Sequence, residues 1–167
     1  HNSYLFKGTV EENLKMAKPD ATKEEMEAVL QKVNLLGFLQ TQDGLQTQLL
    51  EKASNLSGGQ CQRLVIARAL LRTDSAVYIF DEAASNIDVE SEELIMNVIH
   101  ELAKTKTVLL ISHRLANVVK SDKIYFLKDG EIKESGKHDE LMRQNGAYRH
   151  LYESQMALEN YGKGGVA

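Results

Sequence analysis

The sequence of 167 residues lacks several features that would assign its class directly. Its single cysteine, Cys61, excludes an intramolecular disulfide framework and fits a reducing compartment. Its apolar stretches are far shorter than the roughly 20 residues that a membrane-spanning helix requires. The net charge of −4 argues against a nucleic-acid partner, because nucleic-acid binders normally present a basic stripe. No spacing of cysteines and histidines suggests a zinc site.

The most consequential absence is a phosphate-binding loop, since the pattern G-x-x-x-x-G-K-[ST] occurs nowhere in the chain. In that loop, backbone N–H groups and a lysine hold the phosphates of a nucleotide. The composition is otherwise that of a globular protein, with 43% hydrophobic and 26% charged residues. A chain of this length can bury a sizeable core.

Two helix starts are predicted from capping-box patterns. Thr22 is followed by Glu25, and Ser57 is followed by Gln60. The first pattern predicts a helix that ends near Gly37. Its core-facing positions recur at helical spacing: Met26, Val29, Leu30 and Val33.

The second half alternates strand and helix patterns, which predicts an α/β layered fold. Residues 76–80 are a continuous apolar run, which predicts a strand buried on both faces, and residues 107–111 predict a second buried strand. Residues 89–104 have helical periodicity. Residues 123–134 predict a hairpin around Asp129-Gly130. Short helical patterns follow, and Gly162 to Ala167 is expected to be a loose tail.

The run Leu56-Ser57-Gly58-Gly59-Gln60 contains a capping box, and it can also be interpreted as a phosphate-binding helix start. The first N–H groups of a helix lack intrahelical partners, and the helix dipole adds partial positive charge there. Two glycines allow a phosphate to approach this backbone closely. A capping box alone is common and carries no such meaning. The phosphate reading is favoured because the run precedes a strand that ends in two carboxylates.

Those carboxylates, Asp81 and Glu82, follow the first apolar strand. Ligands of α/β proteins bind where parallel strands end. One carboxylate there can hold Mg²⁺, usually through water, and the other can orient or deprotonate an attacking water. The alternative is a strand that ends in a solvated acidic turn. His113 follows the next strand, where a neutral imidazole can contact a γ-phosphate or the attacking water.

In this order, the motifs resemble those of the ATP-binding cassette (ABC) family over nearly the whole chain. Residues 56–60 match the signature motif, and residues 76–82 match the Walker B strand with its catalytic glutamate. Ser85 to Asp88 resembles the D-loop, and His113 resembles the switch histidine of the H-loop. The segments 5–13 and 44–51 are similar to those of ABC exporters. The resemblance implies the later two-thirds of a nucleotide-binding domain.

The resemblance implies a partial P-loop NTPase (ABC ATPase) fold of the α/β class. We expect a mostly parallel sheet flanked by helices, plus a helical subdomain with the signature. Three parts are predicted: residues 1–73 (the end of the Q-loop and the helical subdomain), 74–148 (the Walker B to H-loop part of the core and a hairpin) and 149–167 (a C-terminal helix and flexible tail).

The resemblance also implies the roles of single residues. In the family, two such domains enclose two ATP molecules head to tail. The signature residues would therefore act in trans, on ATP held by a partner domain: Ser57, Gly58, Gly59 and Gln60. For ATP bound in cis, Glu82 and His113 would be catalytic, Asp81 would hold Mg²⁺, and Asp88 would belong to the D-loop.

The implied partners are a second nucleotide-binding domain, as a homodimer or heterodimer, and a transmembrane domain fused upstream. The implied location is the cytoplasmic face of the cell membrane, and the implied cofactors are ATP and Mg²⁺. Without a phosphate loop, we expect this chain alone neither to bind ATP tightly nor to hydrolyse it. The loss of that loop's strand would leave unpaired sheet edges.

The sequence departs from the family pattern at several positions. His1 occupies the expected Q-loop glutamine, and Cys61 replaces a usual basic residue. Asn86-Ile87 replaces the common Ala-Leu of the D-loop. Leu50 and Ala53 occur where the loop before the signature commonly has glycine.

Two other functions remain open at this level. A soluble ABC ATPase of DNA repair, chromosome maintenance or translation would share the motifs, but it usually carries long coiled-coil insertions. A non-catalytic interaction module would have no chemical need for Glu82 and His113. Exporter-like ATP hydrolysis coupled to transport is the favoured interpretation.

Overall fold

The computed structural model describes residues 4–84 and 87–164, which form two compact units. The first unit is residues 1–111 and the second is residues 112–167. The elements of the first unit are β1 (Gly8–Thr9), α1 (Val10–Lys15), α2 (Lys23–Lys32), α3 (Leu36–Gln40), η1 (Gly44–Gln46), β2 (Gln48–Leu49), η2 (Glu51–Ala53), α4 (Gly58–Leu70), β3 (Val77–Asp81), α5 (Val89–Ala103) and β4 (Thr107–Ile111). Those of the second are η3 (Leu115–Val118), β5 (Ile124–Lys128), β6 (Glu131–Gly136), α6 (His138–Gln144) and α7 (Ala147–Gly164).

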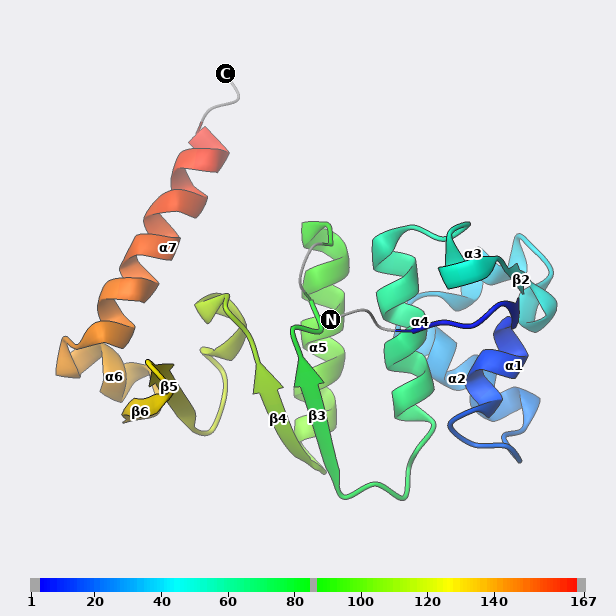
Figure 1. Cartoon of the computed structure of the whole chain (residues 1–167), viewed down its shortest axis with the longest axis horizontal. Helices are drawn as coiled ribbons and strands as arrows, with labels where there is room; N and C mark the ends of the chain where they lie inside the picture. The colour runs from blue at the N-terminus through cyan, green and yellow to red at the C-terminus, as the bar shows by residue number, and fades with distance from the viewer. Residues whose placement is uncertain (1–3, 85–86, 165–167) are drawn as a thin grey trace. The chain divides into compact units, whose positions relative to one another are not determined.

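Helices α1, α2 and α3 gather on one side of α4 in the first unit (Figure 1). Both predicted capping boxes are present and start α2 and α4. Helix α2 ends at Lys32, before the predicted Gly37, because Asn34 adopts a left-handed backbone with φ 51°. Large aliphatic side chains fill the space between these helices, among them Leu14, Leu30, Leu39 and Leu64.

The parallel strands β3 and β4 pack against α5, as the sequence predicts for a sheet flanked by helices. Tyr78 and Phe80 point into this core. The predicted burial of both faces is wrong. On the opposite face Val77 and Ile79 are 55% and 66% exposed, and the register places Leu109 beside Ile79.

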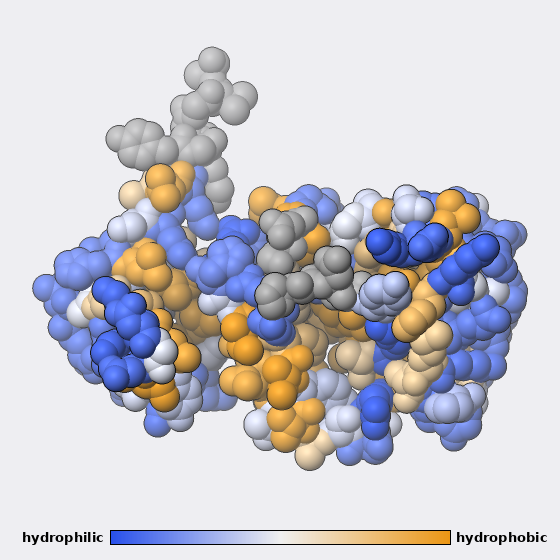
Figure 2. Space-filling model, viewed as in Figure 1, coloured by the Kyte–Doolittle hydropathy of each residue, from blue (hydrophilic) through white to orange (hydrophobic). Residues whose placement is uncertain are grey.

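Figure 2 shows apolar residues gathered over β3 and β4 on this exposed face. Within the described part of the chain, the sheet has two strands and helices cover only one of its faces. A continuous apolar run is typical of strands with a layer on each side. Here the second layer is not supplied by the described residues.

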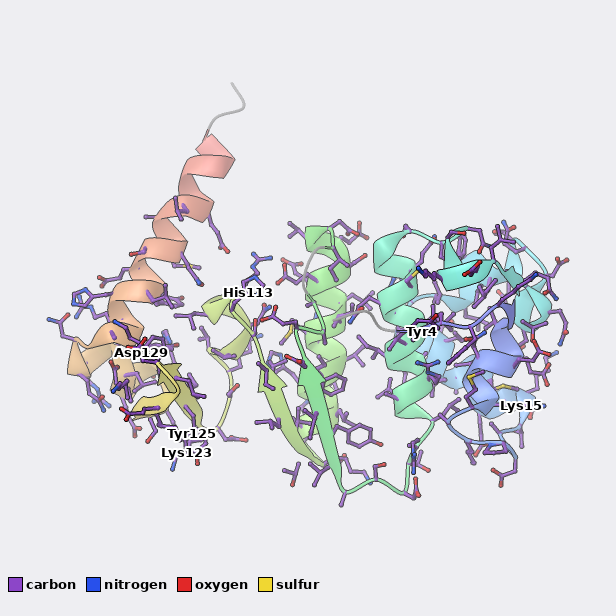
Figure 3. The ribbon with its side chains drawn as sticks, in the orientation of Figure 1. Tyr4, Lys15, His113, Lys123, Tyr125 and Asp129 are labelled. Atoms are coloured by element: carbon purple, nitrogen blue, oxygen red, sulfur yellow. The ribbon has the colours of Figure 1, made fainter. Side chains whose placement is uncertain are left out.

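The second unit contains the predicted hairpin, formed by β5 and β6. Asp129 and Gly130 have φ values of 53° and 77°, as the turn of a two-residue hairpin requires. Figure 3 labels Asp129 at this turn. Nζ of Lys123 lies 5.1 Å from the centroid of the Tyr125 ring. Tyr148 of α7 is fully buried, and its hydroxyl lies 2.8 Å from Nδ1 of His138.

Helix α7 has 18 residues and continues to Gly164. The loose tail predicted from Gly162 is therefore wrong for its first residues. None of the helices in the described ranges combines the length and the apolar character needed to cross a bilayer.

Candidate functional site

The signature run forms the start of α4. Ser57 is the N-cap residue: its hydroxyl accepts a hydrogen bond from the N–H of Gln60 at 3.2 Å. In return, the side-chain oxygen of Gln60 accepts from the N–H of Ser57 at 2.9 Å. Ser57 and Gly58 are exposed. This helix start therefore presents its first N–H groups and its partial positive charge at the surface, as phosphate binding requires.

Gly59, the second glycine of the signature, is buried against the start of α5. A Cβ atom at this position would lie 2.7 Å from Oγ of Ser91 and 3.1 Å from Oδ2 of Asp88. Only a residue without a side chain lets α4 and α5 approach this closely. The structure thus brings the signature together with Asp88, the predicted D-loop residue.

Asp88 is the N-cap residue of α5. Its Oδ1 accepts a hydrogen bond from the N–H of Ser91 at 2.8 Å. This bond lowers the pKa of the Asp88 carboxyl, with a further contribution from the Ser91 side chain. The carboxylate is therefore ionised at neutral pH and places a negative charge at the helix N-terminus that favours it.

Asp81 is the last residue of β3, and Glu82 follows it directly. Asp81 pairs with Ile111 in the register of the sheet, and the N–H of Glu82 donates to the Ile111 carbonyl at 2.9 Å. Glu82 has a φ of 53°, a left-handed conformation that costs an ordinary residue about 1–2 kcal/mol. Ala83 and Ala84 behind it are buried. The chain therefore turns sharply at Glu82, a strained position of the kind found at functional sites.

The donor set fits a magnesium ion only in part. Within residues 4–84 and 87–164, no group of three or more histidine, cysteine or acidic side chains is arranged to hold a metal ion. Magnesium at nucleotide sites is commonly bound by one or two carboxylates together with substrate phosphates. The exposed carboxylate of Asp81 fits that smaller requirement.

His113 belongs to the second unit, in the segment that leads into η3 (Figure 3). Its side chain is exposed. Its carbonyl accepts a hydrogen bond from Nε2 of Gln155 on α7 at 2.8 Å. Gln155 was not predicted from the sequence, because it lies 42 positions away and belongs to no motif, so no local signal points to it.

Several predicted site residues fall outside the described ranges: His1 at the Q-loop position, and Ser85 and Asn86 of the D-loop. Cys61 lies within the described ranges, near the start of α4. Its Sγ lies 3.6 Å from the carbonyl of Ala53 in the loop before the signature, and partial burial raises the pKa of the thiol. Where the family usually has a positive charge, this chain has a neutral thiol.

Comparisons with known proteins agree with this fold. The chain is similar in structure to a bacterial Atm1-family ABC exporter with ATP bound, with a TM-score of 0.85 and 31% identity over 93% of this chain and 27% of that one. It is 53% identical to an uncharacterized ABC transporter ATP-binding protein of Haemophilus influenzae, over 95% of this chain and 28% of that protein. It is 44% identical to an ATP-dependent lipid A-core flippase of Mannheimia succiniciproducens, over 91% of this chain and 26% of that protein.

The fold is thus that of an α/β protein of the ABC ATPase type, present in part. The profile of the ABC transporter family matches residues 1–85, and the chain belongs to that family. It spans little more than a quarter of the length of the curated relatives it matches.

Proposed function

We propose that a complete transporter containing this chain couples ATP hydrolysis to export across a membrane. The chain would supply the signature, the acidic strand end and the switch histidine. The observation that carries this proposal is the exposed start of α4, where Ser57 and Gly58 begin a helix that is packed through Gly59 onto Asp88. The exporter-like fold and the flippase relative support export as the direction.

In this proposal the signature acts on ATP held by a second nucleotide-binding domain. The N–H groups at the start of α4 stabilise charge on the phosphates, with the helix dipole in support. Gln60 acts indirectly, because its side chain fixes the backbone of Ser57. The residues assigned to this role are Ser57, Gly58, Gly59 and Gln60.

The other residues serve ATP bound to the same domain. Glu82 orients or deprotonates the attacking water, and His113 contacts the γ-phosphate or that water. Asp81 would hold Mg²⁺, which neutralises charge on the phosphates when bound. A phosphate loop is absent from this sequence, so another segment of the complete protein would supply it.

The proposed partners are a second nucleotide-binding domain and a transmembrane domain, at the cytoplasmic face of the cell membrane. Two other functions are less well supported. Relatives named as a lipid flippase and as a multidrug export protein favour transport over a soluble ABC ATPase. The strained backbone of Glu82 favours catalysis over a passive interaction module, which would gain nothing from that strain.

The test is Glu82→Gln in the full-length transporter, reconstituted in lipid vesicles. If Glu82 is the catalytic carboxylate, the kcat for ATP falls by about 100-fold or more while ATP binding is retained. Glu93→Gln, an exposed position on α5, is the matched control and leaves turnover unchanged. Near-normal turnover in Glu82→Gln would contradict the assignment.

A further inference from the structure

Helix α7 contacts the backbone on the carboxyl side of His113 through one side chain. Gln155 makes two hydrogen bonds there. Its Oε1 accepts from the N–H of Leu115 at 2.9 Å, and its Nε2 donates to the carbonyl of His113 at 2.8 Å. All of these residues belong to the second unit. A single amide therefore bridges the two backbone groups that flank Arg114.

Two more contacts restrain the same short segment. The guanidinium of Arg114 pairs with Glu159 at 2.9 Å, and Glu159 lies four positions beyond Gln155 on the same face of α7. The N–H of Arg114 donates to the hydroxyl of Ser112 at 3.0 Å. The backbone around His113 is thus held by a local turn on one side and by α7 on the other.

The chemistry of the amide explains why glutamine suits this position. A glutamine side chain offers both a donor and an acceptor, and here each has a backbone partner. Glutamate would keep the bond to Leu115, but it would set a negative oxygen against the His113 carbonyl. Methionine has a similar shape and makes neither bond. Because both bonds are to backbone, they restrain the peptide groups that follow His113, and with them the backbone that carries the imidazole.

We propose that Gln155 is a positioning residue that holds His113 in the orientation needed for ATP hydrolysis. This inference rests on the proposed function of His113. It makes α7 part of the catalytic apparatus, although α7 carries none of the family motifs in this sequence. The competing explanation is that Gln155 only fastens α7 to the rest of the second unit.

The experiment compares Gln155→Met with the wild type in the full-length transporter. Displacement of a catalytic group by about 1 Å can cost up to about 100-fold in rate, so we expect kcat to fall by about 10- to 100-fold. The KM for ATP should change little, because the variant removes no contact to ATP. Gln144→Met, at the exposed end of α6, is the matched control.

A double-mutant cycle separates positioning from fastening. In a His113→Ala background, Gln155→Met should have no further effect on kcat, because the group it positions is already absent. A loss of the same factor in both backgrounds would overturn the proposal, and so would a kcat equal to that of the wild type. Glu159→Gln provides a second test if Gln155→Met does not fold. It should lower kcat less, again only when His113 is present.

If the proposed roles of Glu82 and His113 in ATP hydrolysis were themselves wrong, the variants would give a different pattern of turnover. If Glu82→Gln or His113→Ala retained full turnover, the assignment of the site itself would be wrong, and the inference would fall with it. If both variants lost turnover while Gln155→Met did not, only the positioning role would be wrong.

Discussion

At the scale of single residues, Gly59 determines how closely α4 approaches the start of α5. Ser91 Oγ and Asp88 Oδ2 occupy the space next to its Cα, where any other residue would place a Cβ. Glu82 is a second position where the backbone is constrained, here by a left-handed φ. Both constraints lie in the motifs assigned to ATP chemistry, and both can be tested by small substitutions.

Gly59→Ala should push α4 away from α5. The added methyl group would overlap Ser91 Oγ, and overpacking of this kind costs about 1–3 kcal/mol. We expect a lower midpoint of thermal unfolding and a lower ATPase rate in the full-length transporter. Adding Ser91→Gly removes the overlapping atoms and should restore part of both.

The control for this substitution is Gly37→Ala in α3. Nothing lies within 4 Å of a Cβ at Gly37, so alanine there should be neutral or stabilising by up to about 1 kcal/mol. Equal losses in Gly37→Ala and Gly59→Ala would show that the close approach to Ser91 is not the cause.

At the scale of elements, α2 and α4 begin with the same device. Thr22 and Ser57 are both N-cap residues in complete capping boxes. The two helices differ in their first residues after the cap. Helix α2 continues with Lys23 and Glu24, whereas α4 continues with Gly58, which is exposed, and Gly59, which is buried against α5. The two caps therefore allow a purely structural cap, Thr22, to be compared with the cap for which we propose a role toward phosphate, Ser57.

Thr22→Ala and Ser57→Ala should cost similar amounts of stability, about 1 kcal/mol each, because each removes one N-cap hydrogen bond. Only Ser57→Ala should also lower the ATPase rate. Thermal unfolding and steady-state hydrolysis of the two full-length variants check this. An unchanged rate in Ser57→Ala would leave Ser57 as an ordinary cap.

Elements defined by neighbouring residues could be predicted from the sequence. Both capping boxes, the parallel strands and the Asp129-Gly130 hairpin follow from patterns a few residues long, and the structure contains them. The sequence wrongly predicted that both faces of β3 are buried. Burial of the second face depends on another layer of structure, which no local sequence pattern describes.

The candidate site shows the same limit. Its motif residues could be identified from their order along the chain. The contact of Gly59 with Asp88 and the two bonds of Gln155 join residues that are far apart in sequence, so neither could be found from spacing. Glu82 and Ala53 have left-handed φ values, which glutamate and alanine rarely adopt. Only Ala53 has a signal in the sequence, because the resembling family commonly has glycine at that position.

At the scale of the whole molecule, the apolar face of β3 and β4 is the feature with the largest consequence. Four large aliphatic side chains on it are 45–66% exposed: Val77, Ile79, Leu109 and Ile111. Soluble monomers rarely expose contiguous apolar patches of more than a few hundred Å². In residues 4–84 and 87–164 this sheet has two strands, so backbone N–H and C=O groups along its outer edges can pair with another chain.

We therefore expect the 167-residue chain, purified alone, to self-associate. Light scattering should give a mass well above the 18.7 kDa of one chain. The double variant Ile79→Thr/Leu109→Thr should reduce this mass, because it makes two neighbouring positions of the face polar while keeping residues that favour strands. The control Val89→Thr/Leu158→Thr changes two exposed aliphatic residues on helices and should not reduce it.

The two double variants distinguish association through the apolar face of β3 and β4 from non-specific association through any exposed aliphatic residue. If both reduced association equally, scattered surface residues would be responsible. A monodisperse monomer of the unmodified chain would contradict the prediction, since the strands would then tolerate water on a face of aliphatic side chains. If only the sheet variant is monomeric, the apolar face of β3 and β4 is the surface through which the chains associate, because the exposed aliphatic residues on the helices then contribute nothing to the association.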